Sequence, residues 1–301
     1  MNYIKKDINA EFKGMKLSKY LKEELDLSSR FTRRAAEDRR IYINGKTRKL
    51  NYRIKEKDSL TIDLKEEETQ NIEPWEREID VVYEDTSILV VNKEADMVVH
   101  PTKNSKHHTL SNAIINHYRY NNENTIVRLV SRLDMDTSGT VLLAKNQYVH
   151  SYFAKELEKN TIKREYIAVV EGKFPKDIKI IDFPIYRDPI EKYKRVINNL
   201  GQESKTEVFS VKYINGYSIL KLGLITGRTH QIRVHLSHLG YPIVGDSLYG
   251  GNEKFIERQV LHARTIKFTH PMTRENMVLN ANIPDDISLL FDKLNIKEYD
   301  I

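Results

Sequence analysis

The sequence predicts an α+β protein in which a small basic helix-loop-strand region precedes a larger region built on a mixed or antiparallel sheet. Three observations predict this class. The 301-residue chain is long enough for about two domains. Its excess positive charge lies at one end: residues 1–64 hold 17 Lys and Arg against 10 Asp and Glu (+7), and residues 65–301 hold 32 against 33 (−1). Beyond residue 78, strand-like runs outnumber helices without alternating with them, which disfavours a Rossmann-type sheet.

The composition excludes several classes of protein. Hydrophobic residues make up 40% and charged residues 31% of the chain, as in a globular protein. No apolar run approaches the roughly 18 residues of a membrane span, and the first residues lack the apolar core of a signal peptide. We therefore expect a cytoplasmic protein without membrane association. Because the sequence has no cysteine, disulfides, thiolate metal sites and cysteine nucleophiles are excluded.

The first region, residues 15–64, is predicted to contain two short helices and two strands. Leucines four residues apart predict the first helix over 17–25, and Ser28 is a candidate cap for the second. Strands are expected at 41–43 and 60–64, with an Asn-Gly turn after the first. The basic residues on the second helix stand at i, i+3 and i+4, which predicts three guanidinium groups on one side: Arg30, Arg33 and Arg34.

The order of these elements resembles the ribosomal-protein-S-four-like RNA-binding domain, in which a basic helix faces structured RNA. The matching segments are LSKYL, SSRFTRRAAEDRRIYINGK and KEKDSLTIDL. The resemblance implies that Arg30, Arg33, Arg34 and Lys46 contact RNA. Taken without that order, the same residues are also explained as the solvated basic face of a small α+β domain.

The remaining chain divides into a linker and a second region. Residues 65–78 are acidic and polar and are expected to link the two regions. The second region, 79–297, is expected to have strands at 79–83, 88–92, 126–133, 141–144, 166–170, 207–211 and 218–224, and helices at 111–118, 147–159 and 230–239.

Three familiar kinds of site find no support in the second region. The sequence contains no glycine-rich phosphate-binding loop. His230, His235 and His238 cluster, but their spacing is not that of metal ligands on one helix face, so no metal is expected. The letters GDSL at 245–248 match an esterase motif, but they come late in the chain and among turn residues, so we interpret them as a turn.

The strongest candidate for chemistry is VRLVSRLDMDTSGTVLLAK, residues 127–145. Asp134 follows a predicted strand, sits in a loop of small residues and has Arg132 nearby, a placement common in active sites. Taken alone, the segment is equally well explained as ordinary turn chemistry, in which Asp136 caps the turn.

Four motifs in a fixed order resemble the RluA/RluD-type pseudouridine synthases. The first lies between Val82 and Pro101, and the others are RLDMDTSG, KREYIAVVEG and TGRTHQIRVHL. Further matches continue to Pro271, and an N-terminal S-four-like module is a recurrent companion in that family. The resemblance implies a catalytic domain that isomerises uridine in RNA to pseudouridine without a cofactor or metal.

Carried onto this sequence, the resemblance implies that Asp134 is the catalytic aspartate, which adds to a sugar carbon or removes a sugar proton. Tyr166 would stack on the target base. Arg233, with Arg228 as the second choice, would lie beside Asp134 and favour its ionised form.

The resemblance also implies RNA contacts near the catalytic aspartate. Arg132 would fill the gap left when the target nucleotide leaves its stack, and Arg228 and His230 would face RNA. The sequence departs from the family pattern at Ser131, Glu94 and Asp96, which leaves the subfamily open.

The substrate and the oligomeric state are expectations of the resemblance. Large-subunit ribosomal RNA is expected first and tRNA second, with a monomer sufficient for activity. A catalytically silent RNA-binding or ribosome-assembly factor that keeps the fold is the alternative from another class of protein.

Overall fold

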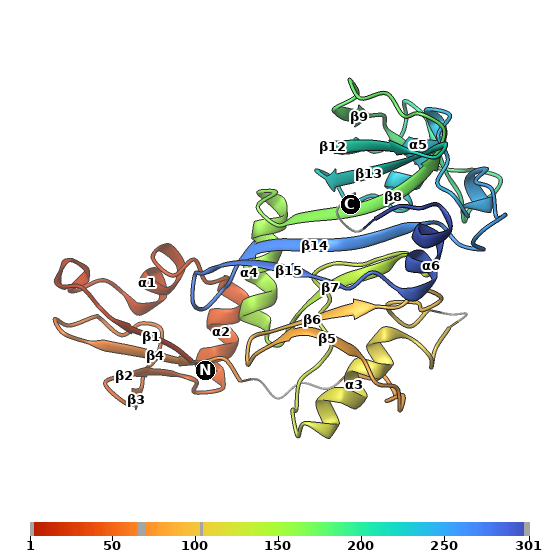
Figure 1. Ribbon diagram of the computed structural model, residues 1–301. Helices are drawn as coiled ribbons and strands as arrows, with labels where there is room; N and C mark the ends of the chain where they lie inside the picture. The colour runs from red at the N-terminus through yellow and green to blue at the C-terminus, as the bar shows by residue number, and fades with distance from the viewer. Residues whose placement is uncertain (1–2, 66–69, 103–104, 298–301) are drawn as a thin grey trace.

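The computed structural model describes residues 3–65, 70–102 and 105–297. Within these ranges the strands form a four-stranded sheet near the N-terminus, a nine-stranded sheet and a two-stranded hairpin, with helices packed on the sheets (Figure 1). The predicted α+β class is confirmed. No helix in the described ranges is both long enough and apolar enough to cross a membrane.

The N-terminal sheet has the strand order β1-β4-β2-β3, with every pair antiparallel. Ser28 caps the second helix, because its hydroxyl accepts a hydrogen bond from the Phe31 amide at 3.2 Å. Strand β1 lies before residue 15, so the sheet begins earlier in the chain than the sequence predicts. The elements are β1 (Tyr3–Asp7), η1 (Ala10–Phe12), α1 (Leu17–Glu23), α2 (Ser29–Glu37), β2 (Ile41–Ile43), β3 (Lys46–Thr47) and β4 (Ser59–Asp63).

The large sheet has the order β5-β6-β7-β14-β8-β13-β12-β9, with β15 paired to β14. Its pairs are antiparallel except β7 with β14, which run parallel at the centre. The sheet is therefore mixed. Its strands are β5 (Asp80–Glu84), β6 (Ile88–Lys93), β7 (Ser138–Ala144), β8 (Lys163–Glu171), β9 (Ile180–Asp182), β12 (Lys205–Ile214), β13 (Tyr217–Leu224), β14 (Leu261–Thr269) and β15 (Asn276–Asn280), and β10 (Ile185–Arg187) with β11 (Arg195–Ile197) forms the separate hairpin.

Helices cover both faces of the sheet. On β6 and β7, Leu89 and Val141 pack with α3, and Ile88 and Leu142 pack with α4, so alternate residues of each strand enter different cores. Two further helices pack against the β8–β13 half. The helices are α3 (Leu110–Tyr120), α4 (Gln147–Glu158), α5 (Gln231–His238), η2 (Ser247–Tyr249) and α6 (Asp285–Lys293).

The strand predicted at 126–133 does not form. The stretch pairs with β7 through an isolated bridge between Leu129 and Leu143. The Val130 amide donates to the Leu142 carbonyl at 2.9 Å, and the Ser131 hydroxyl accepts the Leu142 amide at 3.0 Å. Side-chain packing thus accounts for the apolar character of this stretch, because Val127 and Leu129 belong to the core under α3. Strands β14 and β15 and helix α6 are not among the predicted elements.

The described part of the expected linker packs against the second region. Trp75 donates its amide to the Asn112 carbonyl at 3.1 Å, and the Asn112 side chain donates to the Glu73 carbonyl at 2.7 Å. Ile72 is buried in the core under α3. Residues 66–69 of the expected linker lie outside the described residues.

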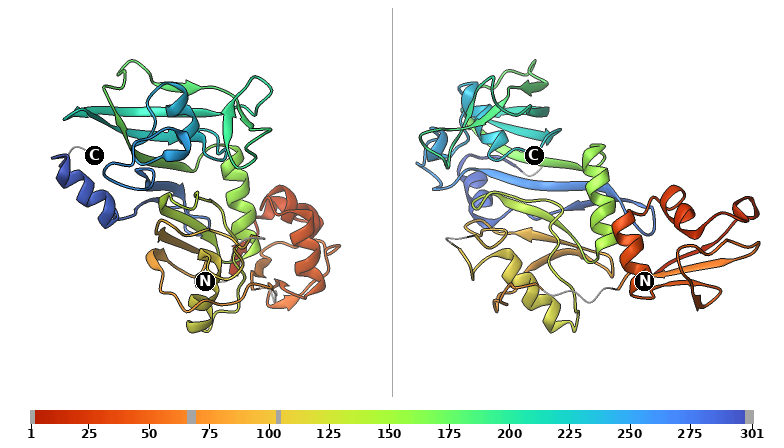
Figure 2. Two further views of the ribbon diagram at one scale, coloured as in Figure 1. Left: turned by 90° about the vertical axis from the view of Figure 1, so that its right-hand side faces the viewer. Right: turned by 180° about the vertical axis from the view of Figure 1, so that it is seen from behind.

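The N-terminal region packs against α4, as the views in Figure 2 show. The ring of Phe31 on α2 lies 6.3 Å from that of Tyr148 on α4, and Met272 from the β14–β15 turn joins the same core. Lys155 on α4 forms an ion pair with Asp26 at 2.7 Å. This contact sets the orientation of the basic helix relative to the sheet.

Candidate active site

The loop that carries Asp134 precedes β7 at the centre of the large sheet. A turn brings the Thr137 amide to the Asp134 carbonyl at 3.2 Å. Gly139 then allows β14 to approach: its φ is +118°, and a Cβ there would lie 2.3 Å from the Ala263 carbonyl oxygen. The Asp134 loop is therefore positioned by the parallel β7–β14 pair.

Lys93, at the end of β6, binds this loop through its side chain. Its ammonium donates to three carbonyls, those of Glu94 (2.6 Å), Met97 (2.9 Å) and Met135 (2.7 Å), which match its three N–H donors. Only 1% of Lys93 is exposed. This burial lowers its pKa to about 7, although Asp136 and Asp134 oppose the shift. Lys93 lies within the first of the four motifs, between Val82 and Pro101, and was not among the predicted site residues.

The side chain of Asp136 was expected to cap the turn, but it makes none of the hydrogen bonds that close the turn. The turn closes through the backbone of Asp134 and Thr137. Asp136 contributes its carbonyl, which accepts a hydrogen bond from Arg258 at 3.0 Å.

Arg233, in the first turn of α5, faces two carboxylates. Its Nη1 lies 3.6 Å from Asp134 Oδ2, and its Nε and Nη2 bind both oxygens of Asp246, at 2.7 and 2.8 Å. Asp246 is 1% exposed. Burial alone would lower the pKa of Arg233, but the Asp246 and Asp134 carboxylates raise it above its usual value. The guanidinium is thus fixed in its charged form.

Asp246 is the functional candidate that the sequence analysis missed. It lies in the GDSL segment, which was interpreted as a turn. The segment is indeed a turn leading into η2, with the Tyr249 amide bonded to the Asp246 carbonyl at 3.0 Å. The sequence carried one signal of a functional role, because Asp246 follows a glycine shortly after the helix that bears Arg233. Only the tertiary structure shows that the two side chains pair.

His230 and Tyr249 form a second contact beside Asp134. The Nδ1 atom of His230 lies 2.8 Å from the Tyr249 hydroxyl, and its Nε2 lies 4.0 Å from Asp134 Oδ2. The Tyr249 oxygen also accepts the Arg195 amide at 2.9 Å. Burial lowers the pKa of His230 and raises the pKa of Tyr249 to about 12.

Tyr166 lies on β8 and is buried, with 4% of its surface exposed. Burial raises the pKa of its phenol; Arg164 opposes this shift and the charge of Asp134 adds to it. The phenol therefore keeps its proton near neutral pH. The structure brings together Asp134, Tyr166 and the His230–Arg233 segment, which are three separate segments of the chain.

The other residues predicted to contact RNA near the site differ in their placement. Arg132 is exposed on the same loop as Asp134. Arg228 is also exposed, but its Nε donates to the Glu203 carbonyl at 3.1 Å, so its guanidinium is directed to that segment. Of the two arginines considered for pairing with Asp134, Arg233 makes the contact, at 3.6 Å.

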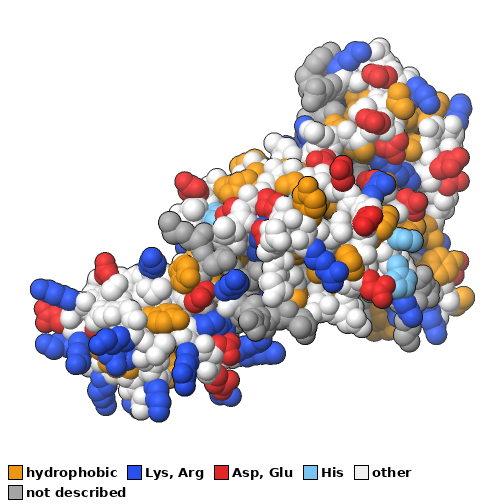
Figure 3. Space-filling view, turned by 90° about the horizontal axis from the view of Figure 1, so that it is seen from below, with side chains coloured by type: hydrophobic (Ala, Val, Ile, Leu, Met, Phe, Trp, Pro, Cys, Tyr) orange, Lys and Arg blue, Asp and Glu red, His pale blue; other side chains and the backbone are white. Residues whose placement is uncertain are grey.

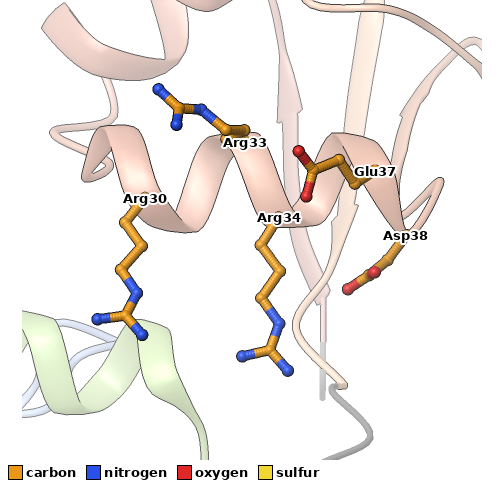
Figure 4. Close-up of a pocket in the computed structure, with 5 residues that line it drawn as sticks. All are labelled: Arg30, Arg33, Arg34, Glu37 and Asp38. Atoms are coloured by element: carbon orange, nitrogen blue, oxygen red, sulfur yellow. The ribbon is translucent and has the colours of Figure 1, made fainter.

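The basic residues of the N-terminal region lie apart from Asp134. Lys and Arg side chains gather on that lobe, at the left of Figure 3. Arg30 and Arg34 extend in the same direction from α2, whereas Arg33 extends in another, so two of the three guanidinium groups expected on one side share a direction (Figure 4). All three line one pocket with Glu37 and Asp38. Lys46 is exposed on β3.

The histidines of α5 have separate surroundings. His235 is fully buried, between the Thr206 hydroxyl at 3.0 Å and the Phe183 carbonyl at 3.0 Å. His238 is exposed at the end of the helix and stacks edge-on with Phe183. Among the described residues, no group of three or more His, Asp and Glu side chains is arranged to hold a metal ion.

Comparison with known proteins identifies the family. The model described as RNA pseudouridylate synthase matches residues 87–238, half of the chain and the part that contains Asp134, Tyr166 and Arg233. The chain belongs to the RNA pseudouridylate synthase family. As a pseudouridine synthase it is an isomerase that converts uridine in RNA to pseudouridine, as the motifs predict.

Relatives of this pseudouridine synthase are similar over most of its length. The RNA pseudouridine synthase YhcT of Bacillus subtilis is 39% identical, over 94% of each chain. Ribosomal large subunit pseudouridine synthase D of Escherichia coli is 33% identical, over 85% of this chain and 82% of its own. The RluA/RluD-type resemblance is therefore confirmed.

A solved structure shares the fold of the synthase. The human RNA pseudouridylate synthase domain containing 4 superposes with a TM-score of 0.58 and 20% identity, over 72% of this chain and 93% of its own. That likeness shows the fold.

Proposed function

We propose that the enzyme isomerises uridine in large-subunit ribosomal RNA and that Asp134 is its catalytic residue. The assignment of Asp134 rests on its contact with the Arg233 guanidinium, whose position is fixed by two hydrogen bonds to Asp246. The guanidinium therefore holds a fixed positive charge 3.6 Å from Asp134 Oδ2. The relatives named ribosomal large subunit pseudouridine synthase D support the choice of RNA. Transfer RNA is the second candidate.

The proposed reaction breaks the bond between C1′ of the ribose and N1 of uracil. The uracil turns within the site, a bond forms between C1′ and C5, and the C5 proton is released as N1 regains one, so the atoms balance. Arg233 and His230 both contact Oδ2 of Asp134. The other oxygen, Oδ1, is therefore the one we assign to the sugar, as nucleophile or as base.

Tyr166 and Arg132 are assigned to the flipped nucleotide. A buried phenol that keeps its proton offers a flat surface on which uracil stacks. Arg132 is exposed next to Asp134 along the loop, so its long side chain can enter the gap that the uridine leaves. Flipping costs a few kcal/mol, which such contacts offset.

The N-terminal region is assigned to RNA binding. Its basic side chains would bind phosphates with little regard to sequence, and the contact of α2 with α4 would orient bound RNA relative to Asp134. We place the RNA-binding unit at 15–64 with β1 added to its sheet, and the catalytic unit at 79–297 with residues 70–78 packed on it. All proposed catalytic groups come from one chain, so a monomer would suffice, acting in the cytoplasm.

The decisive experiment compares Asp134→Asn with Asp136→Asn, a matched change in the same loop. Each purified variant is incubated with ribosomal RNA and tRNA from a strain lacking the protein, and pseudouridine is mapped in both at single-nucleotide resolution. We expect Asp134→Asn to abolish formation and Asp136→Asn to retain it. Wild-type formation by Asp134→Asn would overturn the catalytic assignment, and modified sites found only in tRNA would overturn the substrate.

A further inference from the structure

Tyr249 and His230 form a hydrogen-bonded pair that faces Asp134, and the proposed chemistry gives Tyr249 no part. The two rings meet edge-on, with centroids 5.7 Å apart at 83°. Tyr249 is buried. His230 precedes α5 with a left-handed backbone (φ +57°), which turns its side chain out of the helical register. The ring is therefore held at both ends, by the backbone and by the phenol.

The hydrogen bonds of Tyr249 determine which way the shared proton points. Its oxygen accepts the Arg195 amide at 2.9 Å. Its own hydroxyl hydrogen is then available to donate, and His230 Nδ1 lies 2.8 Å away. Because burial raises the pKa of Tyr249 to about 12, the phenol retains that hydrogen at neutral pH. Nδ1 is thus an acceptor.

The far side of the imidazole favours the same arrangement. A neutral histidine carries one N–H, so a ring that accepts at Nδ1 donates from Nε2. Nε2 lies 4.0 Å from Asp134 Oδ2. The opposite tautomer would place a nitrogen lone pair against a carboxylate, which is electrostatically unfavourable. Around the ring, Asp134 and Asp246 favour the protonated form while burial, Arg233 and Arg195 disfavour it, and burial is the largest of these effects.

We propose that Tyr249 holds His230 in its Nε2–H tautomer. His230 is then a positioning residue: it directs a fixed N–H donor toward Asp134 and does not act as a base. The same short turn then supports both groups that face the carboxylate: Asp246 binds Arg233, and Tyr249, within the following η2 segment, binds His230. The catalytic significance rests on the proposed role of Asp134, but the tautomer does not.

The tautomer is tested directly by long-range proton–nitrogen NMR of the enzyme labelled with ¹⁵N-histidine. The chain has 10 histidines, so His230 is assigned from the signal that disappears in His230→Gln. We expect a neutral ring with the proton on Nε2 at pH 7.5, and a mixture of tautomers in Tyr249→Phe. A proton on Nδ1, or a charged ring, in the wild-type protein would overturn the proposal. This readout is unaffected if Asp134 proves not to be catalytic.

A pair of substitutions tests the role of the donor in catalysis. The amide of His230→Gln can replace Nε2–H, whereas the shorter amide of His230→Asn reaches only the Nδ1 position. We expect kcat to fall about threefold in His230→Gln and about tenfold or more in His230→Asn, with little change in KM for RNA. His238→Asn, on the same helix but exposed, should leave kcat unchanged.

The backbone supplies an internal control for this comparison. Asparagine adopts the left-handed conformation of residue 230 more readily than glutamine does. If His230 acted only through its backbone shape, His230→Asn would be the more active variant. That order, with both variants folded by circular dichroism, would contradict the proposal.

Discussion

Arg233 is bound more closely by Asp246 than by Asp134. Two short hydrogen bonds, at 2.7 and 2.8 Å, join it to Asp246, and a single 3.6 Å contact joins it to Asp134. The buried pair with Asp246 therefore sets the position of the guanidinium. Asp134 receives the charge without sharing its own oxygens in a bidentate bond, which leaves the carboxylate accessible to a substrate.

Replacing Asp246 should destabilise the protein and impair catalysis together. Asp246→Ala leaves a buried guanidinium without its main partner, and we expect the free energy of unfolding in urea to fall by about 3–5 kcal/mol. Where the variant remains folded, its rate of pseudouridine formation should also fall, because Arg233 is no longer held beside Asp134. As a control, Glu23→Gln removes a surface pair with Lys19 and should change stability by less than about 0.5 kcal/mol. A stable, fully active Asp246→Ala protein would contradict this account.

Lys93→Met should lower activity by loosening the Asp134 loop. The substitution removes the donors to three carbonyls, including that of Met135 next to Asp134. We expect kcat to fall about tenfold or more with RNA affinity little changed, since Lys93 is buried. Titration of RNA binding alongside single-turnover rates measures both. Lys173→Met, at an exposed position, serves as the matched control and should behave as wild type.

The same lysine should make stability depend on pH on the alkaline side. Its folded pKa of about 7 is below the value of about 10.4 in an unfolded chain. Between these values the unfolded state binds more protons, so the free energy of unfolding should rise with pH, by about 1.4 kcal/mol per unit from this group. Urea unfolding at pH 7 to 10 should show this slope in the wild type and lose it in Lys93→Met. Parallel slopes in the two proteins would exclude Lys93 as the cause.

His262 should destabilise the fold in mild acid. It is 1% exposed and lies 3.0 Å from the Ser138 hydroxyl at the start of β7, and burial lowers its pKa to about 4. Between about pH 6.5 and about pH 4, His262 is protonated in the unfolded chain but stays neutral in the folded protein. The free energy of unfolding therefore falls by about 3 kcal/mol over this range. Thermal melts of wild type and His262→Gln across this range should converge at low pH. A constant difference between them would refute the assignment.

Arg30 and Arg34 should contribute to RNA binding through phosphates. They extend in the same direction from α2 (Figure 4). We expect the double change Arg30→Gln with Arg34→Gln to weaken binding of different RNA sequences to a similar extent and to reduce the slope of log affinity against log salt by about 2. Single-turnover chemistry at saturating RNA should persist. Point changes are preferable to removing residues 1–64, because truncation would uncover Tyr148 and Met272, which pack on the N-terminal core.

Local features of the chain predicted several parts of the structure well. The Ser28 cap, the helix that follows it and the Asn-Gly turn depend on neighbouring residues, and all are present. The motifs around Asp134, Tyr166 and Arg233 predicted the family and the reaction, both of which are confirmed. The strand predicted at 126–133 is absent because the backbone hydrogen bonds of this stretch to β7 are irregular. The amides of Val130 and Ser131 both bond to the Leu142 carbonyl, so the pairing ends as an isolated bridge.

The sequence by itself determined the reaction class and the identity of the candidate aspartate, because both are encoded in short motifs whose order along the chain is distinctive. Only the tertiary structure decided what surrounds that aspartate. Asp246 reaches Arg233 from a turn after α5, and Lys93 reaches the Asp134 loop from another strand. Both are buried charges, and a buried charge must be satisfied by whatever groups the fold brings to it, which spacing along the chain does not specify.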